Sequence, residues 1–318
     1  MTSEIIEVAN KALTECLNLR RDEKLLVVCD PPCMEIGNAF YEAGHKRCKE
    51  AVMVMFSPRK QDGNEPPEPT GKWFSHFDVA VMPTSKSLTH TQARRDASQS
   101  GTRIATLPGI NTEAFLRTMK TDLRKLGIIT RKVAGRLSSA KKIRITSSAG
   151  TDLIFETGGR AAQADDGRLT SKGAFGNLPA GEAFLAPLEG TAEGKLVIDG
   201  SFPLFKSIPE QPLVLKVKEG RVCAIEDHPC AGELEKIFVK HHPLSRNIAE
   251  FGVGTLDTAQ IRGNILEDEK VLGTVHVAIG DNVSMGGTVC VPVHLDGVLI
   301  RPDVWFDGRL WMKDGELI

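Results

Sequence analysis

Two side chains with metal-ligand chemistry, His294 and Asp296, lie two residues apart directly before Gly297. Side chains at positions i and i+2 of a strand point to the same face, so this imidazole and this carboxylate can converge on one cation. His276 lies in a second strand-like run, GTVHVAIG, with a valine on each side. An imidazole between apolar neighbours is either a buried, hydrogen-bonded core residue or a ligand, and the core role is the more common of the two.

Two glutamates lie in apolar, glycine-containing surroundings, where an unpaired carboxylate would be costly. Glu182 ends the run NLPAGE, and Glu250 lies in NIAEFG. The sequence therefore predicts a metal site in the C-terminal half of the chain, with these ligands: Glu182, Glu250, His276, His294 and Asp296. Nitrogen and oxygen ligands suit Zn, Co, Mn and Fe(II), so the residue types alone leave the metal open.

The N-terminal part of the chain alternates apolar runs with helical patterns. Strands are expected at Lys24–Cys29, Ala51–Phe56, Asp78–Met82 and Arg103–Leu107. Helical patterns cover residues 34–48 and 90–99, and a further helix is expected from Thr112, with Asn111 as its N-cap. This alternation predicts an α/β domain whose parallel sheet is covered on both faces.

The pattern changes near residue 140. From Ile143 onward, short strand-like runs are separated by Asp-Gly and Glu-Gly pairs, which are typical of hairpins. One helix is expected at residues 230–240 and another at 258–264. The sequence thus predicts an α/β N-terminal domain over residues 1–140 and a β-rich α+β catalytic, metal-binding domain over residues 141–318, with the boundary inside Arg136–Lys142.

Composition excludes several classes of function. The 318 residues include 40 Lys and Arg against 41 Asp and Glu, for a net charge of −1, which gives no general attraction to nucleic acid or to membranes. No apolar run approaches the ~20 residues that span a bilayer, and the N-terminus lacks a secretion pattern. Seven cysteines, an odd number without an export signal, indicate reduced thiols and a cytoplasmic protein. No Walker A, Gly-x-Gly-x-x-Gly or Gly-x-Ser-x-Gly motif is present in a fitting context.

Four segments carry a resemblance to a known family: NLPAGEAFLAPLEGTAEGKLVIDGS (177–201), NIAEFGVGTL (247–256), LEDEKVLGTVHVAIGDN (266–282) and VHLDGV (293–298). In this order they resemble the M29 family of metallo-aminopeptidases (aminopeptidase T-like), including the related 2,5-dihydroxypyridine 5,6-dioxygenase group. The run SLTHTQARRDASQSGTRIATLPGI (87–110) is similar to the same group.

The resemblance implies a pair of divalent metals, Zn, Co or Mn, on the five predicted ligands. It also implies a homodimer and a small-molecule or short-peptide substrate. Our first prediction is therefore a metal-dependent hydrolase similar to the M29 leucyl aminopeptidases, in which a metal-activated water attacks a peptide or amide carbonyl. Glu182 would bridge the metals or transfer a proton.

One departure from the family pattern leaves two alternatives open. The peptidases carry a Tyr seven residues after the histidine of GTVH, where this chain has Val283, and its only tyrosine is Tyr41. The first alternative is a mononuclear non-haem Fe(II) ring-cleaving dioxygenase of the dihydroxypyridine type. Two His and one carboxylate would then hold the iron. These would be His294, Asp296 and a further His: His276, His241 or His242. The second alternative is a non-catalytic family member that binds a metal or another ligand.

Overall fold

The computed structural model describes residues 2–318, which form two compact units. The first unit runs to Leu123 and includes Asp165–Ala180, and the second comprises Arg124–Ala164 and Gly181–Ile318. The predicted α/β architecture is confirmed. This division differs from the boundary that we predicted near residue 140. Helix α6 (Leu123–Ser139) buries Val133 and Leu137 in the core of the second unit, and residues 165–180 return to the first unit.

The first unit is built on a parallel sheet with the strand order β2-β1-β3-β4-β8. The strands are β1 (Lys24–Cys29), β2 (Glu50–Met55), β3 (Val79–Thr84), β4 (Arg103–Pro108) and β8 (Phe175–Asn177). All four pairings between them are parallel. Strands β1, β3 and β4 are buried almost throughout, as the continuous apolar runs predict for a sheet covered on both faces. The edge strand β8 was not expected, because it comes from beyond the predicted boundary.

Helices precede, connect and follow these strands. They are α1 (Ser3–Lys11), α2 (Met34–Gly44), α3 (Glu68–Trp73), α4 (Gln92–Gln99) and α5 (Thr112–Thr118), and α1 continues into a π-helical turn at Ala12–Cys16. The Asn111 side chain accepts a hydrogen bond from the Ala114 amide at 2.8 Å, which confirms the predicted cap of α5.

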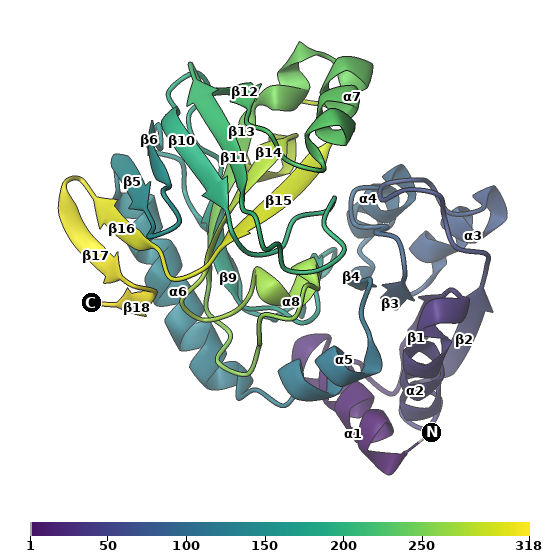
Figure 1. The fold of residues 1–318 in the computed structure, drawn as a ribbon. Helices are drawn as coiled ribbons and strands as arrows, with labels where there is room; N and C mark the ends of the chain where they lie inside the picture. The colour runs from purple at the N-terminus through teal and green to yellow at the C-terminus, as the bar shows by residue number, and fades with distance from the viewer. Residues whose placement is uncertain (1) are drawn as a thin grey trace. The chain divides into compact units, whose positions relative to one another are not determined.

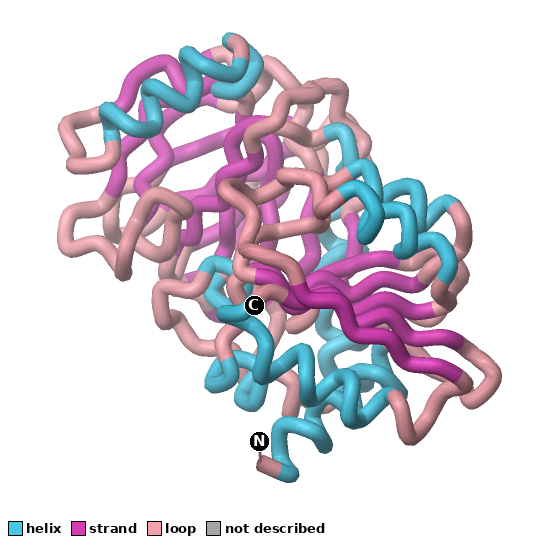
Figure 2. The backbone as a smooth tube through the Cα atoms, turned by 90° about the vertical axis from the view of Figure 1, so that its right-hand side faces the viewer, coloured by secondary structure: helices cyan, strands magenta, loops and turns pink. Residues whose placement is uncertain are grey.

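Strands rather than helices form most of the regular structure of the second unit (Figures 1 and 2). One sheet has the order β12-β11-β10-β6-β5-β16-β17-β18, and the other has the order β15-β14-β13-β9-β7. The strands of the first are β5 (Lys142–Thr146), β6 (Asp152–Glu156), β10 (Glu193–Ile198), β11 (Leu213–Lys218), β12 (Arg221–Ile225), β16 (Asp303–Phe306), β17 (Arg309–Lys313) and β18 (Glu316–Leu317). Those of the second are β7 (Gln163–Asp165), β9 (Glu182–Leu185), β13 (Ile248–Gly254), β14 (Val275–Gly280) and β15 (His294–Leu299).

The sheet β15-β14-β13-β9-β7 packs its apolar face against the core of the second unit. Val275, Val277 and Ile279 of β14 belong to the same buried cluster as Leu196 and Ile198 of β10. Successive side chains of a strand alternate between the two faces, so the even-numbered residues of β14 point the other way. This alternation places the polar residues of the C-terminal motifs together on the opposite face.

The helix predicted at residues 230–240 is confirmed as α7 (Ala231–His241), but the helix predicted at 258–264 is wrong. That segment is a loop before the short helix α8 (Ile265–Asp268). Asp268 accepts hydrogen bonds from the amides of Arg262 and Gly263 at 2.8 and 2.7 Å, and Glu267 accepts one from Gln260 at 2.9 Å. The amides of this loop therefore donate to side-chain oxygens, whereas in a helix they would donate to backbone carbonyl oxygens.

None of the helices that the structure describes in residues 2–318 combines the length and the apolar character needed to cross a lipid bilayer.

Candidate metal centre

The five predicted ligands lie on one face of the sheet β15-β14-β13-β9-β7. In the antiparallel register, Glu182 lies opposite Gly254, Gly252 opposite His276, and Ala278 opposite both Glu250 and Asp296. Cross-strand partners share a face, as do residues i and i+2 of one strand. Strands β9, β13, β14 and β15 therefore bring together residues that are up to 114 positions apart in the sequence, from Glu182 to Asp296.

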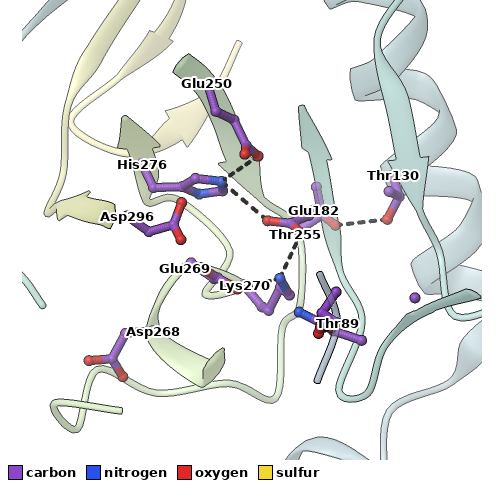
Figure 3. Close-up of polar contacts among 12 residues, drawn as sticks. Thr89, Thr130, Glu182, Glu250, Thr255, Asp268, Glu269, Lys270, His276 and Asp296 are labelled. Atoms are coloured by element: carbon purple, nitrogen blue, oxygen red, sulfur yellow. Dashed lines mark hydrogen bonds and ion pairs between the residues drawn. The ribbon is translucent and has the colours of Figure 1, made fainter. Parts of the chain in front are cut away.

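The side-chain atoms of this group converge through the two imidazoles, and Figure 3 shows the ring of His276 with its contacts to Glu182 and Glu250. His276 Nε2 lies 3.2 Å from Glu182 Oε2 and 3.3 Å from Glu250 Oε1. His294 Nε2 lies 3.2 Å from Glu250 Oε2 and 3.3 Å from Asp296 Oδ1. The two carboxylate oxygens of Glu250 thus face one imidazole each, and this residue joins the two halves of the cluster.

Two overlapping groups of potential metal ligands result. One comprises Glu182, Glu250 and His276, and the other comprises Glu250, His294 and Asp296; within each group the ligand atoms lie within 4.8 Å of one another. The alternative histidines, His241 and His242, are not members of either group. They lie at the end of α7, where His242 accepts a hydrogen bond from the Leu244 amide at 3.1 Å. Among the histidines that we considered as a further ligand, the structure thus brings His276 to the site.

Both imidazoles direct Nε2 toward the carboxylates. His294 Nδ1 lies 2.9 Å from the carbonyl oxygen of Asp281, so Nδ1 carries the proton that this contact needs and Nε2 is the nitrogen on which a metal ion could replace a proton. His276 Nδ1 is buried without a hydrogen-bond partner among the described residues, so this ring makes its polar contacts through Nε2. Imidazole Nε2 atoms and carboxylate oxygens that face one another are the donor arrangement of a divalent metal site.

The cluster has an excess of negative charge, which the pKa values of the histidines reveal. Burial by itself lowers the pKa of His276, but its hydrogen bond to Glu250 and the charge of Glu182 outweigh burial and raise this pKa to about 9. Burial opposes protonation of His294 too, yet the charge of Asp296 and the hydrogen bonds to Asp296 and Glu250 raise its pKa well above the ordinary value. Protons on the imidazoles thus provide the positive charge that a bound cation would otherwise supply.

Two further charged residues of the cluster were missed by the sequence analysis. Lys270 Nζ lies 2.7 Å from Glu182 Oε1 and 2.6 Å from Glu269 Oε1, and the lysine side chain is 0% exposed. Burial, the largest influence on the pKa of Glu269, raises it, Lys270 lowers it, and the net result is a pKa of about 8. In the sequence these residues belong to the run EDEK, which is typical of a solvated turn, so no local signal distinguishes them.

Glycines make room for the polar side chains. A Cβ on Gly252 would collide with the ring of His276, and one on Gly254 would collide with the backbone of Lys270 and Val271. Gly181, directly before Glu182, has a φ of 133°, a conformation that side-chain-bearing residues rarely adopt. The glycines of the motifs AGE and EFGVG are therefore part of the construction of the site.

The loop between β14 and β15 leads to His294, and Glu189 anchors it. Glu189 Oε1 accepts hydrogen bonds from Asn282 Nδ2 at 2.9 Å and from the Thr288 amide at 2.8 Å, and Oε2 pairs with Arg160 at 2.6 Å. Burial raises the pKa of Glu189, but these donors outweigh it and lower the pKa from 4.5 to about 2. Because the pKa falls on folding, the carboxylate stabilises the folded state fully above pH 4.5 and loses this effect as the pH falls through 2.

Replacement of Glu189 by glutamine is expected to lower the free energy of unfolding at pH 7 by about 1–3 kcal/mol, because charged hydrogen bonds are lost. Urea unfolding at pH 7 and at about pH 3 measures this deficit, which should be smaller at the lower pH. Glu210→Gln, at an exposed position, is the control and should change little. A deficit that does not depend on pH would contradict the assigned role.

Comparisons with known proteins bear on this site. A sequence profile of the family described as 2,5-dihydroxypyridine 5,6-dioxygenase matches residues 35–318. The chain is 25% identical over 244 residues to the 2,5-dihydroxypyridine 5,6-dioxygenase of Pseudomonas putida KT2440, a match that covers 73% of this chain and 69% of the relative.

Two solved structures share the fold. A structure of 2,5-dihydroxypyridine dioxygenase from Pseudomonas putida KT2440 matches with a TM-score of 0.83 at 20% identity, over 100% of this chain and 98% of the other. Wild-type AmpT from Thermus thermophilus matches with a TM-score of 0.75 at 15% identity, over 99% of each chain.

Proposed function

The chain belongs to the 2,5-dihydroxypyridine 5,6-dioxygenase family, and from this premise we propose that it is a non-haem Fe(II) dioxygenase that cleaves a hydroxylated pyridine ring. The observation that carries the proposal is the cluster of imidazoles and carboxylates on one sheet face, in a chain whose family profile covers residues 35–318. Two His and one carboxylate with open coordination positions are the ligand set of non-haem Fe(II) oxygenases.

The expectation of a metallo-aminopeptidase-like hydrolase is wrong. The family profile and the Pseudomonas putida relative both favour the dioxygenase that we gave as an alternative. AmpT resembles this chain in fold, at 15% identity, and supports the broad relationship with the M29 group without supporting peptide hydrolysis here. The resemblance from which we predicted the hydrolase covers both groups, so the candidate ligand residues did not separate the two chemistries.

His276, His294 and Asp296 are the proposed iron ligands, and Glu250 is a fourth candidate because its carboxylate lies between the two imidazoles. Bound Fe(II) with open positions would bring O2 and the hydroxylated ring together. The Asp281 carbonyl accepts the hydrogen bond of His294 Nδ1 and so orients Nε2 of this ring toward the metal position. Its carboxylates supply the negative charge that offsets a divalent cation.

Protein reconstituted with Fe(II) under anaerobic conditions is expected to consume O2 when 2,5-dihydroxypyridine is added, at about one O2 per ring, because both oxygen atoms enter the ring-opened product. An oxygen electrode and the loss of ring absorbance measure this. Zn-loaded protein is the control, since Zn²⁺ has no redox chemistry. Absence of O2 uptake by Fe-loaded protein with this and related hydroxylated aromatic rings, accompanied by release of the amine from leucyl amides, would overturn the proposal.

A further inference from the structure

Lys270 is a fully buried amine inside a cluster of candidate metal ligands. It lies in the segment between α8 and β14, and the backbone of this segment is held against the end of β13. The Leu256 amide donates to the Lys270 carbonyl at 2.8 Å, and the Gly254 amide donates to the Thr274 carbonyl at 3.1 Å. Because Gly254 has no Cβ, the Lys270 backbone can lie directly against this strand. Backbone hydrogen bonds thus fix the segment that carries Lys270, and its ammonium group lies at the polar face of the sheet.

The ammonium group of Lys270 contacts one oxygen of Glu182, and the other oxygen of this carboxylate faces His276. Glu182 Oε1 lies 2.7 Å from Lys270 Nζ, and Glu182 Oε2 lies 3.2 Å from His276 Nε2 (Figure 3). On its other side Lys270 Nζ contacts Glu269 Oε1 at 2.6 Å. A carboxylate that bridges two metal ions must offer one oxygen to each. Here one of the two oxygens faces the ammonium group of Lys270 instead.

We propose that Lys270 substitutes for a second metal ion: it neutralises Glu182 and so reserves Glu250, His276, His294 and Asp296 for a single divalent ion. The inference rests on the proposed function in that it assumes a metal site at this cluster. Lys270 acts through Glu182, so it is a positioning residue. The two glutamates thus have separate roles, since Glu250 lies between the imidazoles and Glu182 pairs with the lysine.

The test is the number of metal ions that each chain binds. Metal-free wild-type protein and variants are dialysed against excess Co(II) or Zn(II), and ions per chain are measured by elemental analysis. Wild type should bind about one ion, and Lys270→Met about two, because the freed oxygens of Glu182 and Glu269 form a second ligand set. The visible absorption of bound Co(II) reports whether the second ion adds a new coordination environment. Wild-type protein that binds two ions, or folded Lys270→Met that still binds one with unchanged affinity, would overturn the proposal.

A charge-matched variant covers the case in which Lys270→Met does not fold. Glu182→Gln combined with Lys270→Met removes one negative and one positive charge, so the balance of the cluster is kept. If Lys270 serves Glu182, this double variant should fold, bind about one ion as wild type does, and show the wild-type Co(II) spectrum. Loss of the ion would show that Lys270 or Glu182 supports the first metal instead, contrary to the proposal.

The number of metal ions per chain tests the role of Lys270 independently of the reaction that the protein catalyses. Two ions per chain together with O2 uptake on 2,5-dihydroxypyridine would reject the role of Lys270 and leave the proposed function standing. One ion per chain without O2 uptake on any hydroxylated ring would reject the proposed function and leave the role of Lys270 standing.

Discussion

Replacement of His294 by alanine is expected to reduce metal occupancy to less than about a tenth of the wild-type value and to abolish ring cleavage with it. His294 Nε2 faces Glu250 and Asp296 at 3.2 and 3.3 Å, so removal of the ring takes away the nitrogen ligand of the group that these three residues form. The carboxylates of Glu250 and Asp296 would remain, without the imidazole nitrogen that is the third member of this ligand group. Elemental analysis of the purified variant, followed by the oxygen-electrode assay, measures both effects.

The matched control is His241→Ala, which removes an imidazole that lies outside the cluster at the end of α7. Metal content and activity should both stay at the wild-type level in this variant. Thermal unfolding of the metal-free proteins checks that His294→Ala still folds. Should His294→Ala keep its full metal content, the ligand assignment would have to be abandoned, whatever the activity.

Replacement of Gly252 by alanine is the second change with a large expected effect. The added Cβ would overlap the Nε2 and Cε1 atoms of His276, which lies opposite Gly252 in the β13–β14 register. His276 is 1% exposed, so the ring has little room to move away. We expect the free energy of unfolding to fall by about 1–3 kcal/mol through overpacking. The metal affinity should fall by about 10-fold or more, because Nε2 is displaced.

Two glycines in helices serve as controls for this substitution. Gly135 in α6 and Gly232 in α7 have nothing within 4 Å of an added Cβ. Alanine at either position should be neutral or should stabilise the protein by up to about 1 kcal/mol, since alanine is the better helix former. Urea unfolding and metal titration of the three variants separate the steric effect at His276 from the general effect of adding a methyl group. Wild-type metal affinity in Gly252→Ala would refute the close approach of strand and ring.

Local patterns in the sequence account for much of the fold and for the choice of candidate ligand residues. The buried strands β1, β3 and β4 are continuous apolar runs, and the period of two in β14 and β15 sorts polar from apolar side chains. That period alone places His294 and Asp296 on one face, and their contact at 3.3 Å follows from it. The loop at residues 258–264 could not be foreseen in the same way, because its amides bond to Glu267 and Asp268, which come later in the chain.

The sequence by itself determined which side chains are able to bind a metal and which strands carry them, since donor chemistry and strand period are local properties. Only the tertiary structure decided that His276 rather than His241 or His242 meets the other ligands, and that Glu250 lies between two imidazoles. It also revealed Lys270, whose partner Glu182 is 88 residues away. The reason is physical: the antiparallel register joins distant segments, and a lysine in a charged run is buried only when carboxylates from elsewhere in the chain compensate its charge.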